Sequence, residues 1–260
     1  MAPLLPRLLP LLTLLLTLLA LPPLLLLTTT FVAGYQEMQE NLPRWQSLSI
    51  NRQIVHDETY TQTPTQAWQF APLVDYHGGS NAALEPFAEH FEAWEWTLAT
   101  YLGAGYGTCY RGDRLYDTPK VQAMVSKWMA FWVRYRAILS QDVVHVKRPD
   151  MQRIDAIAHI DSNASAAICA LLMVYNPAVS GGNATAKLSL PLYFSGESEA
   201  VMLSREEGPL SRVALRRDYS ISLNVSLPPL GITYFVVRRL KPAAGSLLPA
   251  NPPRLKSLAI

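Results

Sequence analysis

Two short apolar segments, each followed by a polar loop and then by a segment with helical periodicity, constrain the fold of this chain most strongly. The first is WQFAPLV at 68–74 and the second is AGYGTCY at 104–110. A strand, a polar loop and a helix, repeated along a chain, are typical of a β/α barrel, in which chemistry sits on the loops that follow the strands. We therefore expect a functional site on the loops at 75–81 and 111–119.

Helical periodicity follows each of these two strands. From Glu85 on, apolar residues recur at steps of three and four, with Pro86 suited to the first turn and Gly103 to the end: Phe87, Phe91, Trp94, Leu98 and Tyr101. In the second segment, Thr118 is the expected N-cap and Pro119 the first helical residue, and the apolar face consists of Val121, Met124, Trp128, Phe131, Trp132 and Tyr135. These faces predict core packing rather than a ligand site. A weaker pattern predicts a further helix within 36–58.

After Ser140 the helical period gives way to eight short strand-like runs separated by turn residues. Several alternate strictly between apolar and polar residues, which predicts an antiparallel β-sandwich. The expected fold class is therefore α/β plus all-β, a partial β/α barrel followed by a sandwich. The expected parts are a leader at 1–33, a barrel segment at 34–141, the sandwich at 142–240 and a disordered tail at 241–260.

The first residues form a targeting segment, because 4–27 are almost wholly Leu, Pro and Thr. Roughly 20 apolar residues can span a bilayer, so length alone does not separate a cleaved signal from a retained anchor. Prolines at 10, 22 and 23 weaken a continuous helix, which favours a signal peptide cleaved near Ala20 or Ala33. We expect a secreted protein or one in the secretory lumen, anchored to a membrane only if 4–27 is retained.

Three Asn-X-Ser/Thr sequons, at Asn163, Asn183 and Asn224, fit glycosylation in that compartment. The two cysteines, Cys109 and Cys169, fall in different expected domains. We expect two buried free thiols, with a disulfide as the alternative in an oxidising compartment.

Charge and spacing exclude several classes of function. The formal net charge is +2 and basic residues are scattered, which argues against a nucleic-acid partner. The histidines and cysteines lack the spacing of a metal site. The run GAGYG at 103–107 leads into a strand, whereas a dinucleotide fingerprint opens a helix. We therefore predict no metal and no cofactor.

The polar residues after the two strands are the candidate site. Because neighbouring barrel strands lie about 4.8 Å apart, the two loops face each other, and their carboxylates fall within the roughly 5 to 9 Å used by glycosidases. The candidate acid/base pair is Asp75 and Asp117. The candidate sugar-binding residues are Tyr76, His77, Arg111, Asp113 and Tyr116. The alternative is structural: Asp117 caps a helix, and Arg111 pairs with Asp113.

Several segments resemble the C-terminal half of α-galactosidase-like glycoside hydrolases, in which a catalytic β/α barrel leads into an antiparallel sandwich. The most specific are CYRG, LYDT, YNP and LPLYF, within a match over 68–238. The resemblance implies that 68–74 and 104–110 are the last two barrel strands and that the loops after them line the sugar-binding mouth. In that family the catalytic carboxylates lie on earlier strands. Only the apolar targeting segment at 4–27 and about 40 residues after it stand before the first strand here, whereas each β/α unit needs about 30.

We therefore expect a secreted glycoside-hydrolase-like protein that acts on or binds carbohydrate, with an incomplete catalytic barrel. The alternative is a non-catalytic secreted module that binds carbohydrate or protein. An incomplete barrel leaves strand edges unpaired, which predicts self-association.

Overall fold

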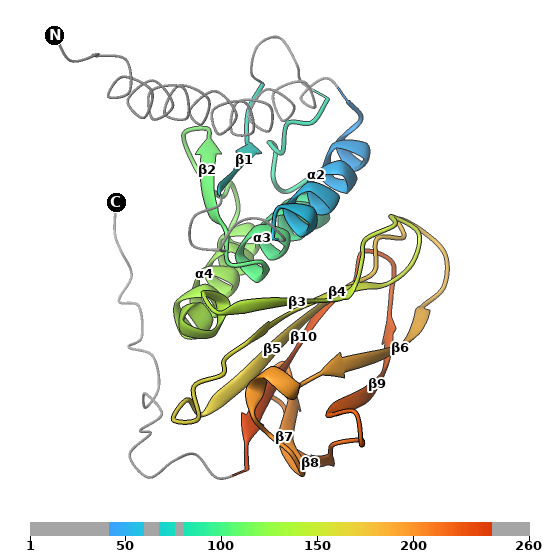
Figure 1. Ribbon diagram of the computed structural model, residues 1–260. Coiled ribbons are helices and arrows are strands. Elements are labelled where there is room, and N and C mark those ends of the chain that lie inside the picture. Colours follow the sequence, from blue (N-terminus) through green and yellow to red (C-terminus); the bar gives the residue numbers. More distant parts are fainter. Residues whose placement is uncertain (1–41, 60–67, 76–80, 241–260) are drawn as a thin grey trace, which may run out of the picture.

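The computed structural model describes residues 42–59, 68–75 and 81–240. The helices are α2 (Arg44–Glu58), α3 (Phe91–Gly103), α4 (Pro119–Leu139) and a short 3-10 helix, η4 (Tyr193–Ser195). The strands are β1 (Trp68–Pro72), β2 (Gly107–Arg111), β3 (Asp142–Lys147), β4 (Asp155–Ile160), β5 (Ile168–Tyr175), β6 (Ala184–Pro191), β7 (Ala200–Arg205), β8 (Ser211–Ala214), β9 (Ser220–Leu227) and β10 (Ile232–Arg239). Figure 1 shows the helices and β1–β2 on one side and the other strands on the opposite side.

All eight strands predicted after Ser140 form, and they build an antiparallel sandwich. Six of them make one sheet in the order β3-β4-β5-β10-β7-β8, and β6 pairs with β9 in the second. The alternation in β9 separates buried Ile221, Leu223 and Val225 from Ser222, Asn224 and Ser226, of which Asn224 and Ser226 are exposed. The expected sandwich is therefore confirmed.

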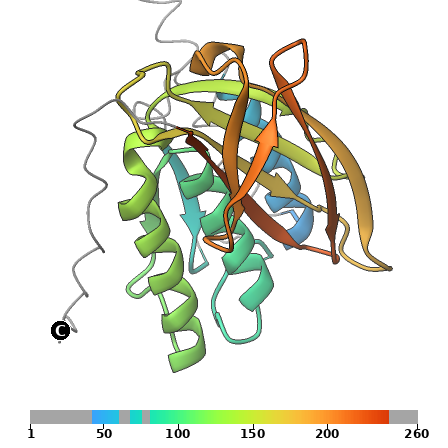
Figure 2. The ribbon, with the colours of Figure 1, turned by 90° about the horizontal axis from the view of Figure 1, so that it is seen from below.

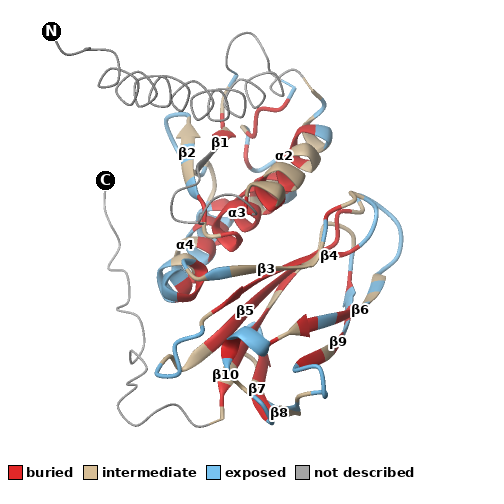
Figure 3. Cartoon of the chain, in the orientation of Figure 1, coloured by how far each residue is buried: buried red, intermediate tan, exposed pale blue. Residues whose placement is uncertain are grey.

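The six-stranded sheet is covered on both faces (Figure 2). One face packs against β6 and β9 around residues such as Leu172, Val174 and Ile221. The other packs against the helices around Leu171 and Met173. Every residue of β4 is buried (Figure 3), as is typical of a strand with both faces covered. Because helices and sheet share a core, the division of the chain into separate domains stays a prediction.

The strands β1 and β2 form a parallel pair, with Trp68 opposite Gly107 and Pro72 opposite Arg111. The hydroxyl of Tyr101, on α3, donates to the Phe70 carbonyl oxygen at 2.9 Å and so ties β1 to the helical layer. No closed barrel is found among the described residues. Self-association through strand edges stays a prediction, because the structure describes a single chain.

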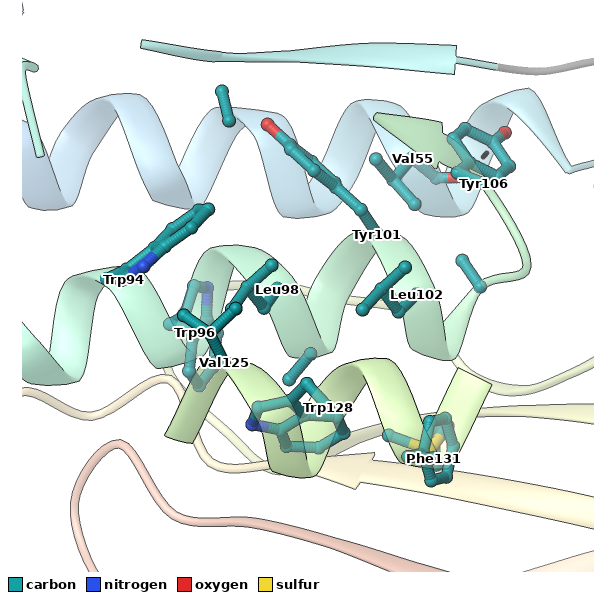
Figure 4. Close-up of a cluster of buried hydrophobic side chains, with 14 of the residues drawn as sticks. Val55, Trp94, Trp96, Leu98, Tyr101, Leu102, Tyr106, Val125, Trp128 and Phe131 are labelled. Atoms are coloured by element: carbon teal, nitrogen blue, oxygen red, sulfur yellow. Dashed lines mark hydrogen bonds between the residues drawn. The ribbon is translucent and has the colours of Figure 1, made fainter. Parts of the chain in front are cut away.

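The helices pack through large aromatic and aliphatic side chains. Figure 4 shows Trp96 and Leu98 of α3 beside Val125 and Trp128 of α4, all part of one buried cluster. The stripe of Trp and aliphatic residues on these two helices therefore forms core, as predicted.

The helix ends test the local predictions. Thr118 caps α4 by accepting from the Val121 N–H at 3.4 Å, with Pro119 first in the helix, as predicted. The start of α3 was predicted wrongly, because Pro86 lies in a turn and the helix begins at Phe91. The turn is closed by the N–H groups of Glu89 and His90, which donate to the Pro86 carbonyl oxygen. A helix within 36–58 is confirmed by α2, and Gly103 ends α3 as predicted.

The two cysteines are both free thiols. Cys169 is buried, and burial raises the pKa of its thiol to about 12. Cys109 is exposed on β2, so the prediction that both thiols are buried is wrong for Cys109. Gly107 and Cys109 are both exposed on β2. The apolar run at 104–110 does not reveal that this side of the strand is uncovered.

A buried ion pair joins α2 to the six-stranded sheet. The Arg52 guanidinium lies 2.5 Å from Asp155 Oδ1 on β4, and both side chains are 0% exposed. The same guanidinium lies over the Tyr175 ring, 4.0 Å from its centroid. Burial raises the pKa of Asp155 to about 6, although Arg52 opposes this shift. Each of these two buried charges is therefore stabilised by the other.

Replacing Asp155 by Asn should leave the Arg52 guanidinium buried without its counter-charge. We expect the free energy of unfolding to fall by about 3–5 kcal/mol, as when one partner of a buried pair is removed. The measurement is urea denaturation at pH 7. The double variant Arg52→Met, Asp155→Leu should recover most of the loss, because it removes both charges; equal losses in the two variants would contradict this explanation.

Stability should fall in acid because of His159. Burial lowers the pKa of His159 to about 4, whereas an unfolded histidine titrates near about 6.5. Between these values the unfolded chain binds a proton that the folded chain does not, so the free energy of unfolding falls as the pH drops from about 6.5 to about 4, by at most about 1.4 kcal/mol per pH unit. Above about 6.5 this contribution does not vary.

The measurement is urea denaturation of the wild type and of His159→Leu across pH 4.5–7. The variant should show a smaller loss towards acid. The raised pKa of Asp155 acts in the opposite direction, but it is present in both proteins and cancels in the comparison. Identical pH profiles would count against the role of His159.

Candidate functional site

The loops after β1 and β2 start side by side, at the same end of the parallel pair (Figure 1). The N–H groups of Leu73 and Val74 both donate to the Arg111 carbonyl oxygen, at 3.0 and 3.2 Å. A β-carbon at Gly112 would lie 2.7 Å from the β-carbon of Leu73. The close approach of the two loops therefore requires glycine at 112.

The loop at 112–118 is attached to the segment that leads into α3. The Arg114 guanidinium lies 3.0 Å from Glu85 Oε2, and this contact raises the pKa of Arg114. The Trp94 indole N–H donates to the Leu115 carbonyl oxygen at 3.0 Å. These contacts fix the loop on the helical layer before any ligand arrives.

Asp117, one of the two candidate catalytic carboxylates, takes part in this attachment. Its Oδ2 accepts from the Ala88 N–H at 3.0 Å. Its Oδ1 is buried and has no hydrogen-bond partner in the described part of the chain. The carboxylate stabilises the turn before α3, whereas the N-cap of α4 is Thr118 itself. The expectation that Asp117 caps a helix is therefore wrong for α4, and its structural role is to hold the turn before α3 instead. Its catalytic role stays a prediction.

The remaining candidates divide by exposure. Asp75, Asp113 and Tyr116 are exposed, whereas Arg111 is half-buried with its guanidinium 3.6 Å from the centroid of the Phe70 ring. No Arg111–Asp113 ion pair occurs among the contacts of the described residues. Exposed carboxylates accept hydrogen bonds from hydroxyl groups, and a phenol offers both a polar group and a flat ring.

Two predicted binding residues, Tyr76 and His77, lie outside the described residues. Two residues that hold the second loop in place were missed by the sequence analysis. Glu85 contacts Arg114, 29 residues away in the chain, and Trp94 contacts Leu115, 21 residues away. No local pattern marks such pairs. No cluster of potential metal ligands occurs in 42–59, 68–75 and 81–240.

The three sequon asparagines, Asn163, Asn183 and Asn224, are all exposed on the sandwich. Asn163 and Asn183 lie in loops, and Asn224 lies on the outer face of β9. Among the residues that the structure describes, none of the helices is long and apolar enough to cross a membrane. Residues 4–27 fall outside that part of the chain.

The chain matches no family model and no curated protein sequence. Its fold is similar to that of several solved glycoside hydrolases. The galactosidase domain of an alpha-galactosidase-sucrose kinase matches with a TM-score of 0.51 and 14% identity, over 74% of this chain and 25% of that one. A β-L-arabinopyranosidase from Geobacillus stearothermophilus matches with a TM-score of 0.44 and 13% identity, over 78% of this chain and 43% of that one.

A third structure, of a protein from Bacillus halodurans, has a TM-score of 0.39 and 13% identity, over 58% of this chain and 31% of that one. The chain thus spans between a quarter and less than half of the length of each of these three proteins. The resemblance to the C-terminal part of α-galactosidase-like glycoside hydrolases is confirmed at the level of the fold.

Proposed function

We propose that this chain is a glycoside-hydrolase-like protein that binds carbohydrate at the loops after β1 and β2. The observation that carries the proposal is the fixed juxtaposition of these loops: both leave the same end of a parallel pair, and the second is held by Glu85, Trp94 and Ala88. The second loop, held in this way, contributes to ligand binding without first having to be ordered. The similarity of fold to a galactosidase domain supports a galactoside as the ligand class.

Binding is favoured over hydrolysis by the position of Asp117. A general acid or base must reach the glycosidic oxygen or a water molecule. One oxygen of Asp117 is engaged by the Ala88 N–H and the other is buried. Exposed Asp75 is left as the accessible carboxylate of the pair. If the chain does hydrolyse glycosides, Asp75 and Asp117 remain the candidates for the acid/base pair.

The purified protein should bind methyl α-galactoside and should not release the aryl group from an aryl α-galactoside. Asp75→Asn should weaken binding about fivefold, because it replaces a charged acceptor of hydroxyl hydrogen bonds by a neutral one. Binding is measured by calorimetry and turnover by absorbance. Turnover that disappears in Asp75→Asn, Asp117→Asn would support the enzyme instead of the binding protein.

A pair of glycine variants provides the control. In Gly112→Ala the new methyl group meets the Leu73 side chain and pushes the loops apart, whereas at Gly182 a β-carbon has no neighbour within 4 Å. Gly112→Ala should weaken binding, and Gly182→Ala should not. Absence of binding to galactosides and of turnover would leave the protein-interaction module as the better explanation.

We also propose that the chain enters the secretory pathway, through cleavage of the apolar leader or anchored by 4–27. Exposure of all three sequon asparagines supports this proposal, because glycans need room at the surface.

Expression in a eukaryotic secretory host should give a protein whose mobility increases after endoglycosidase digestion. Single Asn→Gln changes at Asn163, Asn183 and Asn224 should each reduce the mobility shift by the contribution of one glycan. An unshifted wild-type protein found inside the cell would overturn the proposal.

A further inference from the structure

Three large aromatic side chains are exposed at one end of the β6–β9 pair. Tyr193 is 54% exposed, Phe194 51% and Tyr219 47%. The rings of Tyr193 and Phe194 lie 4.1 Å apart between centroids, with 38° between their planes. The Leu192 N–H donates to the Tyr219 carbonyl oxygen at 2.9 Å, which joins the two segments. We call Tyr193, Phe194 and Tyr219 the aromatic platform.

The platform stands on a fixed base. Tyr193 and Phe194 belong to η4, which directly follows β6. The buried Ser195 donates its hydroxyl to the Leu192 carbonyl oxygen at 2.6 Å. The nearly buried Arg239 donates to the Ser195 carbonyl oxygen, also at 2.6 Å. The exposed rings are therefore carried by a backbone that is already ordered.

Tyr219 is held in a backbone conformation that disfavours a bulky side chain. Its φ is 59°, in the left-handed region. The turn is maintained by the Tyr219 N–H, which donates to the Arg216 carbonyl oxygen at 2.9 Å, and by the Ser220 hydroxyl, which donates to Asp218 at 2.8 Å. Core packing does not explain an exposed tyrosine at this position.

The surroundings of the platform carry both signs of charge. Arg216, Arg217 and Asp218 are exposed and directly precede Tyr219. Exposed Glu199 is brought to the same turn by its carbonyl oxygen, which accepts from the Leu215 N–H at 2.8 Å. Exposed aromatic rings with hydrogen-bond donors and acceptors nearby match a pyranose ring, which has a face of C–H groups and an edge of hydroxyls.

Other occupants fit less well. A stable protein interface buries about 800 Å² on each partner, far more than three partly exposed side chains offer. An anionic membrane surface favours basic residues without acidic neighbours. We propose that the aromatic platform is a second carbohydrate-binding site, separate from the loops after β1 and β2, with Tyr193, Phe194 and Tyr219 stacking on sugar rings and the flanking charged residues binding hydroxyls.

The test is affinity electrophoresis of the full chain in gels containing galactomannan. The variants are the double change Tyr193→Ser, Phe194→Ser and, separately, Tyr219→Asn, since asparagine tolerates a left-handed φ and should leave the protein folded. Each should weaken retardation, with an apparent affinity about fivefold to tenfold below that of the wild type. The matched control is Val133→Ser on α4, which removes a similarly exposed apolar side chain far from the platform in the chain and should change nothing.

Combination with Gly112→Ala separates the two sites. The platform variants should weaken binding to the same extent in the wild-type background and in the Gly112→Ala background, whatever Gly112→Ala does by itself. Unchanged retardation in both platform variants would overturn the proposal. A change from dimer to monomer in Tyr193→Ser, Phe194→Ser on sedimentation would also overturn it, and so would loss of that variant's binding to phosphatidylserine-containing vesicles, because each result identifies a different occupant.

Discussion

The ion pair between Arg52 and Asp155 is the interaction on which the arrangement of the molecule depends. Its partners lie 103 residues apart, one on α2 and the other on β4. A buried charge that loses its partner is costly, so the helical layer and the six-stranded sheet meet in the single arrangement that brings the two groups together. The Tyr175 ring beneath the guanidinium fixes the side chain further. Because both charges had to leave water, the net stabilisation by the pair is small compared with the cost of removing one partner alone.

The same interface positions β1. The Tyr175 hydroxyl donates to the Ala99 carbonyl oxygen of α3 at 2.8 Å, and the Tyr101 hydroxyl, further along α3, donates to the Phe70 carbonyl oxygen of β1. Buried phenol groups thus connect the sheet, α3 and β1 in series. The strand β1 is therefore positioned by the sandwich, through the aromatic core in Figure 4, although it lies on the other side of α3.

Sequence patterns predicted the parts of the fold that depend on neighbours along the chain. Alternation in β9 and the Thr118-Pro119 start of α4 are local, because side-chain direction and a helix cap are fixed within a few residues. The contacts of Asp117 with Ala88 and of Arg52 with Asp155 are not local, and nothing near either residue marks its partner. The start of α3 was predicted wrongly for a related reason. Phe87 fits a helical period, yet it reaches the core from a turn and stacks on Trp94.

The two proposed sugar-binding surfaces lie on opposite sides of the six-stranded sheet. The strands β1 and β2 belong to the helical layer on one face, and η4 and Tyr219 join the β6–β9 pair that covers the other (Figure 1). A monosaccharide or short oligosaccharide contacts one surface at a time. For a glycan long enough to reach both, the second contact would form at the effective concentration set by the first. Two weak sites of this kind suit the retention of a polysaccharide better than the turnover of a small glycoside, in agreement with the engagement of Asp117 in the fold.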